Sequence, residues 1–127
     1  MEEAITEDIE EFFKRYPTSQ EATSAMIEKL IADFDREGTI VGYTFSSIVS
    51  EMGSLSEPVR HACSLLYTKI QGIYSSKLVE EGHSKDTADS IALMMTASIE
   101  GGIMLCLTKR TNEPLRVISQ LLLRLVQ

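Results

Sequence analysis

The sequence is poor in the residues that metal sites, disulfides and many catalytic centres require. Its 127 residues include no tryptophan, two cysteines and two histidines. Cys63 and Cys106 stand far apart in apolar surroundings, so we expect buried free thiols of a reducing compartment. His61 and His83 have no Cys, Asp or Glu at metal-ligand spacing on the same helical face. We therefore predict no metal site and no cofactor.

Positive charge is also scarce. Twelve Lys and Arg residues stand singly or in pairs against nineteen acidic residues, which gives a net charge of −7. Nucleic-acid binding depends on a basic surface that neutralises phosphates, so we expect this chain by itself not to bind DNA. The start of the chain has no signal-peptide pattern, and we expect a cytoplasmic protein.

Catalytic motifs are missing as well. The serine pairs Ser46–Ser47 and Ser75–Ser76 lie in helical segments and have no base at hand. There is no glycine-rich loop between a strand and a helix, so no nucleotide-binding motif is present. With no acid–base or nucleophile pair in evidence, we predict that the protein is not an enzyme.

Helical periodicity, by contrast, runs through the whole chain, and no segment has the period of a strand. Thr18 and Glu21 form a capping box, Pro17 ends the helix before them, and Gly38 supplies a helix stop. The pattern predicts one all-α domain over residues 1–127 with six helices. We expect these helices at residues 1–16, 18–37, 43–52, 56–81, 84–109 and 113–126.

The segment from Ser84 to Lys109 is apolar on every side of the helix that it predicts. Such a helix either crosses a membrane or is covered by protein. The apolar run is short for a membrane span and contains Glu100 and two consecutive glycines, so we favour a helix covered by protein. Gly101 and Gly102 each cost a mid-helix position about 1 kcal/mol, which indicates that another backbone approaches closely there.

The last helix has more apolar surface than one chain can bury. Only Arg116, Gln120, Arg124 and the neighbouring Gln127 define a polar strip on it. Monomers rarely expose so large an apolar patch, and we therefore predict an obligate oligomer.

Glu100 allows two interpretations. It is either a structural hydrogen-bond or salt-bridge partner of a neighbouring helix, or the polar anchor of a ligand pocket. Many soft and amphipathic side chains are predicted on the helices that face it, a composition that suits a cavity for an apolar or aromatic small molecule. These side chains are Tyr43, Phe45, Met52, Tyr67, Tyr74, Met94 and Met95.

Two segments of the sequence resemble a known family. GTIVGYTFSSIVSEMGSLSEPVR and ADSIALMMTASIEGGIMLCLTKRTNEPLRVISQLLLRLV are similar to the C-terminal regulatory domain of TetR-type transcriptional repressors, in particular the LmrA/YxaF-like subgroup. The recognisable pieces are Gly42, Met52 with the residues 55–60, Glu100–Gly101, and Glu113–Pro114–Leu115. The likeness covers most of residues 20–126.

This resemblance implies a bacterial homodimer in which the last two helices of each subunit form a four-helix bundle. The dimer interface is expected at Gly101, Gly102, Leu105, Leu115, Ile118, Leu121, Leu122 and Leu125. The earlier helices would enclose a pocket for a small hydrophobic or aromatic effector. We expect it to be lined by Phe45, Ile48, Met52, Cys63, Tyr67, Ile70, Tyr74, Met94 and Ser98.

The sequence departs from the family in lacking the N-terminal helix-turn-helix domain. The segment 1–16 corresponds to the helix that links this domain to the regulatory domain, and its helical pattern begins without a capping residue. We therefore expect a piece of a longer repressor that contacts DNA only through the missing domain. A purely structural helical dimerisation module, which binds no ligand, is the alternative function.

Overall fold

The computed structural model describes residues 2–38 and 57–126. Within these ranges the chain forms five α-helices and no strand, in agreement with the predicted all-α class. The helices are α1 (Glu2–Arg15), α2 (Ser19–Glu37), α4 (Glu57–Glu80), α5 (Lys85–Lys109) and α6 (Glu113–Leu125). The predicted helix over 43–52 lies outside the described residues, and so do Phe45, Ile48 and Met52 of the expected ligand site.

The helix ends follow from local sequence signals. Thr18 precedes α2, and its side-chain oxygen accepts a hydrogen bond of 3.1 Å from the backbone N–H of Glu21. Ser84 caps α5 in the same way through the N–H of Thr87, at 3.2 Å. Gly38 ends α2 with a φ of 72°, a left-handed conformation that glycine adopts at little cost. These caps satisfy backbone groups that a helix end would otherwise leave without partners.

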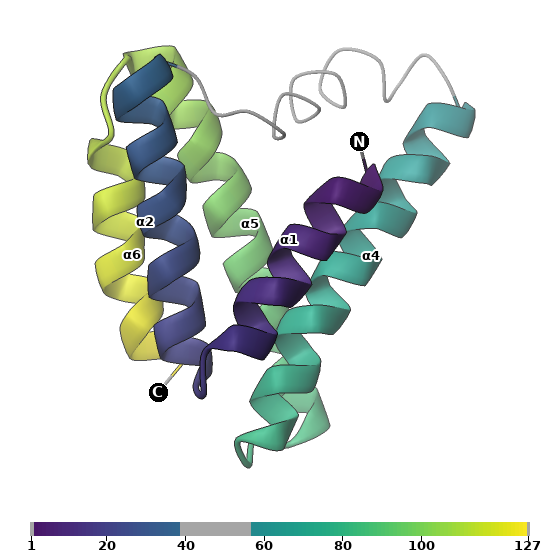
Figure 1. The fold of residues 1–127 in the computed structure, drawn as a ribbon. Coiled ribbons are helices and arrows are strands. Elements are labelled where there is room, and N and C mark those ends of the chain that lie inside the picture. The colour runs from purple at the N-terminus through teal and green to yellow at the C-terminus, as the bar shows by residue number, and fades with distance from the viewer. Residues whose placement is uncertain (1, 39–56, 127) are drawn as a thin grey trace.

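The helices associate as two pairs joined by the longest helix. α1 packs against α4, α2 packs against α6, and α5 packs against both α4 and α6. The two pairs converge at one end of the molecule, where the α1–α2 turn and the α4–α5 turn lie, and they diverge toward the other end (Figure 1). Contact between α2 and α4 is sparse, but α1 also packs against α2, so α1 and α5 both connect the two pairs.

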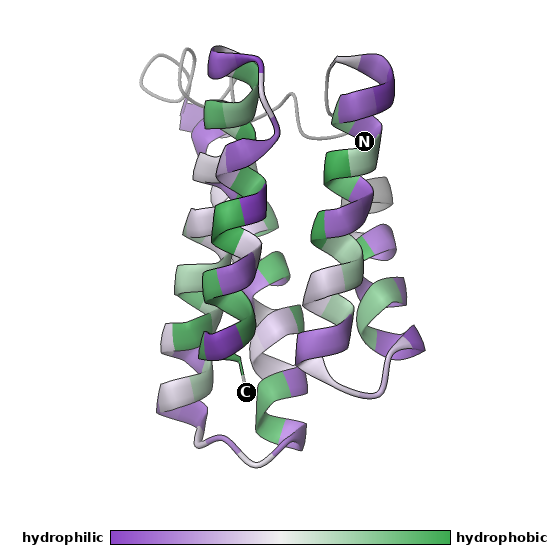
Figure 2. Ribbon diagram, turned by 90° about the vertical axis from the view of Figure 1, so that its left-hand side faces the viewer, coloured by the Kyte–Doolittle hydropathy of each residue, from purple (hydrophilic) through white to green (hydrophobic). Residues whose placement is uncertain are grey.

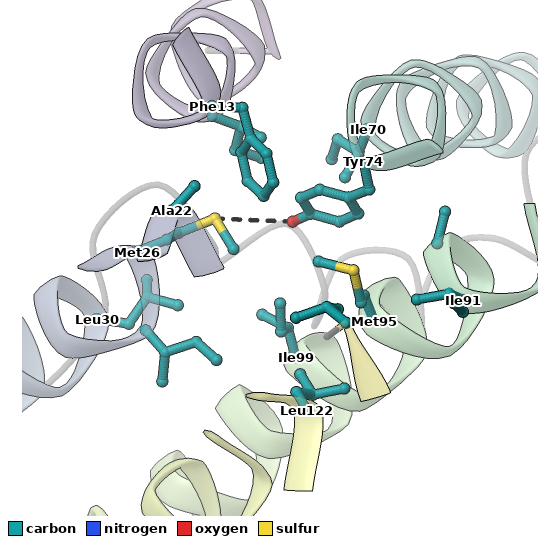
Figure 3. Packing of buried hydrophobic residues seen from close by; sticks show 14 of the residues in the cluster. Phe13, Ala22, Met26, Leu30, Ile70, Tyr74, Ile91, Met95, Ile99 and Leu122 are labelled. Atoms are coloured by element: carbon teal, nitrogen blue, oxygen red, sulfur yellow. Dashed lines mark hydrogen bonds between the residues drawn. The ribbon is translucent and has the colours of Figure 1, made fainter. Parts of the chain in front are cut away.

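The core lies between the pairs, near the end where they converge. Phe13 of α1, Met26 of α2 and Tyr74 of α4 meet there, each 5% exposed or less (Figure 3). The rings of Phe13 and Tyr74 are 5.2 Å apart, and the Tyr74 hydroxyl donates a hydrogen bond to the Met26 sulfur at 3.7 Å. Met95 and Ile99 of α5 close the cluster from below, and the aromatic and thioether groups fill the irregular space between four helices.

The sequence predicts that α5 is buried by other parts of the protein, and the described chain buries it only in part. By length and composition α5 could cross a membrane, and 44% of its most apolar stretch is buried in the structure. Core helices of water-soluble proteins meet the same criterion, so it does not by itself indicate a membrane. Hydrophobic residues recur on successive turns of the helices (Figure 2). α4 and α6 cover two sides of α5, and a third side remains outside the chain's own core.

Candidate functional site

Seven large hydrophobic side chains, each 40–59% exposed, stand on α5 and α6. We call this set the outer apolar face; it consists of Leu93, Met94, Met104, Leu105, Val117, Leu121 and Leu125. Only two other large hydrophobics among the described residues, Leu65 and Val79 of α4, are comparably exposed. Large apolar side chains are therefore concentrated on one pair of adjacent helices, as is typical of an interaction surface.

The helical repeat explains why α6 presents this face. Leu115 and Leu122 are seven residues apart, project on one side of α6 and are 0% and 3% exposed. Leu121 and Leu125 lie on the neighbouring side and are 59% and 41% exposed. α6 therefore buries one apolar side against its own chain, and the described residues do not cover the next apolar side.

The two glycines of α5 have different surroundings. A Cβ atom on Gly102 would lie 2.7 Å from Ile118 Cδ1 and 2.9 Å from Leu115 Cδ2, so Gly102 permits the close approach of α6 in the same chain. A Cβ atom on Gly101 would meet nothing within 4 Å. Gly102 therefore makes room for α6 side chains of its own chain, no neighbour in the described chain requires a glycine at Gly101, and a close crossing with a second subunit stays a prediction.

The eight residues expected at the dimer interface fall into three groups. Leu105, Leu121 and Leu125 belong to the outer apolar face, and Gly101 and Ile118 are half-buried beside it. Gly102, Leu115 and Leu122 are buried within the chain's own α5–α6 contact. The sequence pattern did not separate the intrachain contact from the surface beside it, because both are apolar.

Four of the expected ligand residues share one face of α4. Cys63, Tyr67, Ile70 and Tyr74 are spaced by four, three and four positions, which places them in line along a helix. Ile70 and Tyr74 are each 2% exposed and belong to the core (Figure 3). Cys63 and Tyr67 are half-buried in the first half of α4, the helix that begins at the divergent end (Figure 1). The structure therefore groups these four residues but buries only the pair near the convergent end.

Met94 and Ser98 are not part of this group. Met94 is 53% exposed and belongs to the outer apolar face. Ser98 is one turn before Gly102, on the side of α5 that meets α6. Glu100 is two residues, or about 200°, away from Gly102 and so faces α4 instead. Because α5 is apolar on every side, its sequence gives no signal that distinguishes these sides. Met94 and Ser98 were therefore predicted at the same ligand site.

Glu100 has the neighbouring-helix partner that one of its two interpretations predicted. The Tyr67 hydroxyl donates a hydrogen bond of 3.3 Å to Glu100 Oε2 and thereby joins α4 to α5. Both residues are half-buried. The hydrogen bond between Tyr67 and Glu100 can stabilise the packing of α4 against α5. The same two polar groups could also orient a polar group of a bound molecule.

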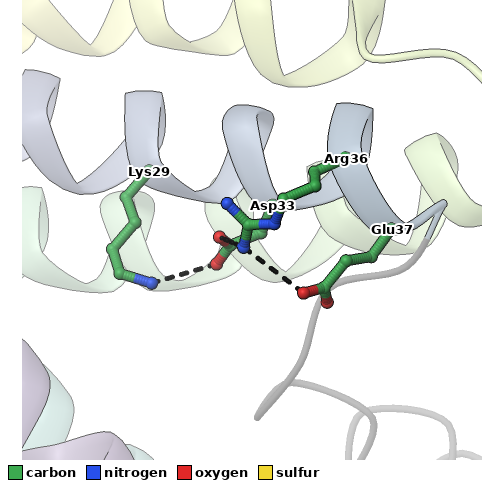
Figure 4. Close-up of polar contacts among 4 residues, drawn as sticks. All are labelled: Lys29, Asp33, Arg36 and Glu37. Carbon is green, nitrogen blue, oxygen red and sulfur yellow. Dashed lines mark hydrogen bonds and ion pairs between the residues drawn. The ribbon is translucent and has the colours of Figure 1, made fainter.

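Asp33 is a buried charged residue that the sequence analysis did not single out. It is 9% exposed on α2, and its carboxylate contacts Lys29 Nζ at 3.0 Å and Arg36 Nη2 at 2.8 Å (Figure 4). Partial burial by itself would raise the pKa of Asp33, but the hydrogen bonds and charges of Lys29 and Arg36 outweigh it and hold the pKa below its usual value. The spacing of these residues at i−4 and i+3 was the available signal.

Three grooves along the surface of α4 are not lined by the described residues of the expected ligand site, and two of them exceed 600 Å³. One, of about 750 Å³, lies between α1 and α4 over Phe13 and Ile73. The other, of about 630 Å³, lies between α4 and α5 beside the hydrogen-bonded pair Ser75 and Asp89. Both are open surface features with mixed polar and apolar linings.

Comparison with known proteins identifies the family. Residues 19–121 match the family described as "Transcriptional regulator LmrA/YxaF-like, C-terminal domain". The chain is 32% identical over 100 residues to the uncharacterized HTH-type transcriptional regulator YxaF of Bacillus subtilis, covering 79% of this chain and 52% of that protein. It is 31% identical over 119 residues to the HTH-type transcriptional regulator LmrA of the same organism, covering 94% of this chain and 63% of LmrA.

The matched region thus spans just over half to under two thirds of these two relatives. It contains α2, α4, α5 and residues 113–121 of α6, so the Tyr67–Glu100 contact and all of the outer apolar face except Leu125 lie within the matched residues. Both relatives are transcriptional regulators rather than enzymes. The chain therefore belongs to the LmrA/YxaF-like family as a C-terminal domain of TetR-type transcriptional regulators.

Proposed function

We propose that this chain is the effector-binding and homodimerisation domain of a bacterial, cytoplasmic transcriptional regulator. It senses a small apolar or aromatic molecule and relays its binding to an N-terminal DNA-binding domain outside the 127 residues. The observation that carries the proposal is the outer apolar face of α5 and α6. Membership of a transcriptional-regulator family supports the regulatory role.

The outer apolar face fits a second copy of the same chain. Two copies related by a two-fold axis would bring α5 and α6 of each subunit into one four-helix bundle, because a self-complementary patch pairs with itself. Gly101 supports this arrangement: it carries the cost of a mid-helix glycine although its own chain leaves room for a side chain. A partner helix that approaches at Gly101 would explain why no side chain is present there.

The proposed effector region lies at the half-buried part of the α4 face, around Cys63, Tyr67 and Glu100. Cys63 and Tyr67 belong to the first half of α4, which begins at the divergent end of the molecule (Figure 1), and contact between α2 and α4 is sparse. Apolar side chains there provide area for an aromatic molecule, and the Tyr67–Glu100 pair provides a point of orientation. An effector with a hydroxyl group could replace or extend that hydrogen bond.

Helix α1 is the proposed relay. It packs on both α4 and α2, with Ile9 and Phe13 buried against them at 1% and 5% exposure. A ligand can alter DNA affinity only through its different affinities for two arrangements of the protein. Coupling of this kind amounts to about 1–3 kcal/mol, which corresponds to about a 5–150-fold change in operator affinity.

The proposal can be tested with 1-naphthol, a neutral aromatic phenol, on this chain. Saturating binding should raise the melting temperature and increase hydrogen-exchange protection along residues 6–15 of α1. Tyr67→Phe keeps the ring and should weaken binding by removing the hydroxyl. Tyr16→Phe, directly after α1, is a matched control and should not weaken binding. Tight binding without a change in α1 would contradict the relay but leave the sensing role standing.

A structural dimerisation module without a ligand remains the second candidate. The observation that favours it is the close packing of Ile70 and Tyr74, two of the expected ligand residues, which are each 2% exposed. If neither 1-naphthol nor smaller and larger neutral aromatics change the melting temperature, the structural module is the better description. The dimer itself is expected in both cases.

A further inference from the structure

The groove between α4 and α5 is electrically neutral along its described lining. Its walls are the second half of α4 and the start of α5, close to the turn that joins the two helices (Figure 1). Among the described residues that line it, the charged ones are Lys85 and Asp89. The Lys85 ammonium nitrogen lies 2.8 Å from both carboxylate oxygens of Asp89, so the two charges compensate each other.

The carboxylate of Asp89 is held in a fixed position by both helices. The hydroxyl of Ser75, a residue that is 5% exposed, donates a hydrogen bond of 2.6 Å from α4 to Asp89 Oδ1. Lys85 holds the same group from one turn earlier on α5. Oδ1 thus accepts two hydrogen bonds and Oδ2 accepts one, so Oδ2 can accept another from a ligand. The Asp89 side chain is 50% exposed, which leaves this oxygen within reach.

Two polar side chains of α4 line the same groove and make no hydrogen bond within the described part of the chain. They are the amide of Gln71 and the hydroxyl of Ser76. The amide provides two donors and an acceptor, and the hydroxyl can donate and accept. The groove therefore offers both donors and acceptors, from two helices that are packed against each other.

Apolar surface is also present in this groove. Val79 is 41% exposed, and a Cβ atom on Gly72 would meet nothing within 4 Å, so no side chain fills the space beside Gly72. The volume of about 630 Å³ is large enough for a molecule of one or two rings. A ligand that matches this lining has an apolar surface, several groups that donate and accept hydrogen bonds, and no charge.

We propose that the groove between α4 and α5 binds a neutral saccharide. A sugar ring carries hydroxyl groups around its edge, and its faces are C–H surfaces without charge. One hydroxyl donates to Asp89 Oδ2, and others exchange hydrogen bonds with Gln71 and Ser76. A face of the ring lies against Val79. The groups that hold the carboxylate are already in place before the ligand arrives, which favours binding.

The test follows the backbone amide shifts of the chain in heteronuclear NMR spectra during titration with D-glucose, D-galactose and maltose. Saturable changes are expected at residues 71–79 and 85–92. A monosaccharide of about twelve non-hydrogen atoms should bind with a Kd of about 1–10 mM. Cyclohexanol, which has the ring but a single hydroxyl, should bind at least about tenfold more weakly. If none of the three sugars gives a saturable change, or if cyclohexanol binds as tightly, the proposal is wrong.

A matched pair of variants assigns the binding to Asp89. Asp89→Ala should weaken saccharide binding by about tenfold or more, because a hydrogen bond to a charged group is lost. Asp86→Ala is the control: Asp86 is an exposed aspartate one turn earlier on α5 and does not line the groove, so binding should stay the same. An equal loss of binding in both variants would reflect the change of net charge and would overturn the proposal.

Should Asp89→Ala fail to fold, Gln71→Ala carries the test. The Gln71 amide makes no hydrogen bond within the described chain, so its loss should leave the fold intact and weaken binding by about 3–10-fold. Unchanged binding would overturn the proposal. Tyr67 and Glu100 of the proposed effector region do not line this groove, so saccharide binding can fail while effector binding stands, and the reverse.

Discussion

Replacement of Leu121 and Leu125 by glutamate is the most direct perturbation of the proposed dimer. Leu121 is 59% exposed and Leu125 is 41% exposed, so together they leave about one whole leucine side chain in water. Burying one leucine contributes about 1.5–3 kcal/mol, which gives about 3–6 kcal/mol for the two chains of a dimer. Every 1.4 kcal/mol is a factor of ten, so Kd should rise about 10²–10⁴-fold.

The assay is sedimentation equilibrium over a range of micromolar concentrations. The unmodified chain should sediment at twice its mass of 14.2 kDa, and Leu121→Glu with Leu125→Glu should sediment as a monomer or aggregate. The matched control is Leu65→Glu with Val79→Glu, which changes side chains of similar exposure on α4 and should remain dimeric.

Two results would refute the reasoning. A well-folded monomer of the unmodified chain at micromolar concentration would mean that the outer apolar face is not self-complementary. A double variant at Leu121 and Leu125 that remains as dimeric as the control variant would place the interface elsewhere. In either case, Leu121 and Leu125 would not be buried by a second copy of this chain.

Three further predictions concern the stability of the chain, each measured by urea unfolding. Gly102→Ala should destabilise the fold by about 1–3 kcal/mol, because the added Cβ would meet Ile118. Gly72→Ala is the control: its Cβ would meet nothing within 4 Å, so it should stabilise the fold by about 0.5–1 kcal/mol. Since the pKa of Asp33 is lowered in the folded state, its ion pairs stabilise the fold above its ordinary value of 3.8 and lose this effect as the pH falls through the folded pKa. Asp33→Asn should therefore cost about 1 kcal/mol at neutral pH and progressively less in acid, and a gap that widens in acid would contradict this. The Thr23 hydroxyl is buried without a hydrogen-bond partner among the described residues, so Thr23→Val should stabilise by about 1 kcal/mol, and a loss of stability would mean that the hydroxyl has a partner.

The sequence by itself determined the helical class, the ends of the five described helices to within a few residues, and the family. Thr18, Gly38 and Ser84 act on backbone groups within a few residues of themselves, so their effect can be read without knowledge of the fold. The surplus of apolar residues on the last helix also predicted surface that the chain does not bury. Each of these inferences depends on composition or on spacing within one helix.

Only the tertiary structure decided which side of α5 faces which neighbour. Because α5 is apolar all round, its pattern has no direction, and the sequence could not tell the Glu100 side from the Met94 side or Gly101 from Gly102. The packing of α4 and α6 makes that choice. The hydrogen bond from the Ser19 N–H, at the start of α2, to the carboxylate of Glu81, directly after α4, was equally beyond the sequence, since these residues are 62 positions apart and meet only in the folded chain.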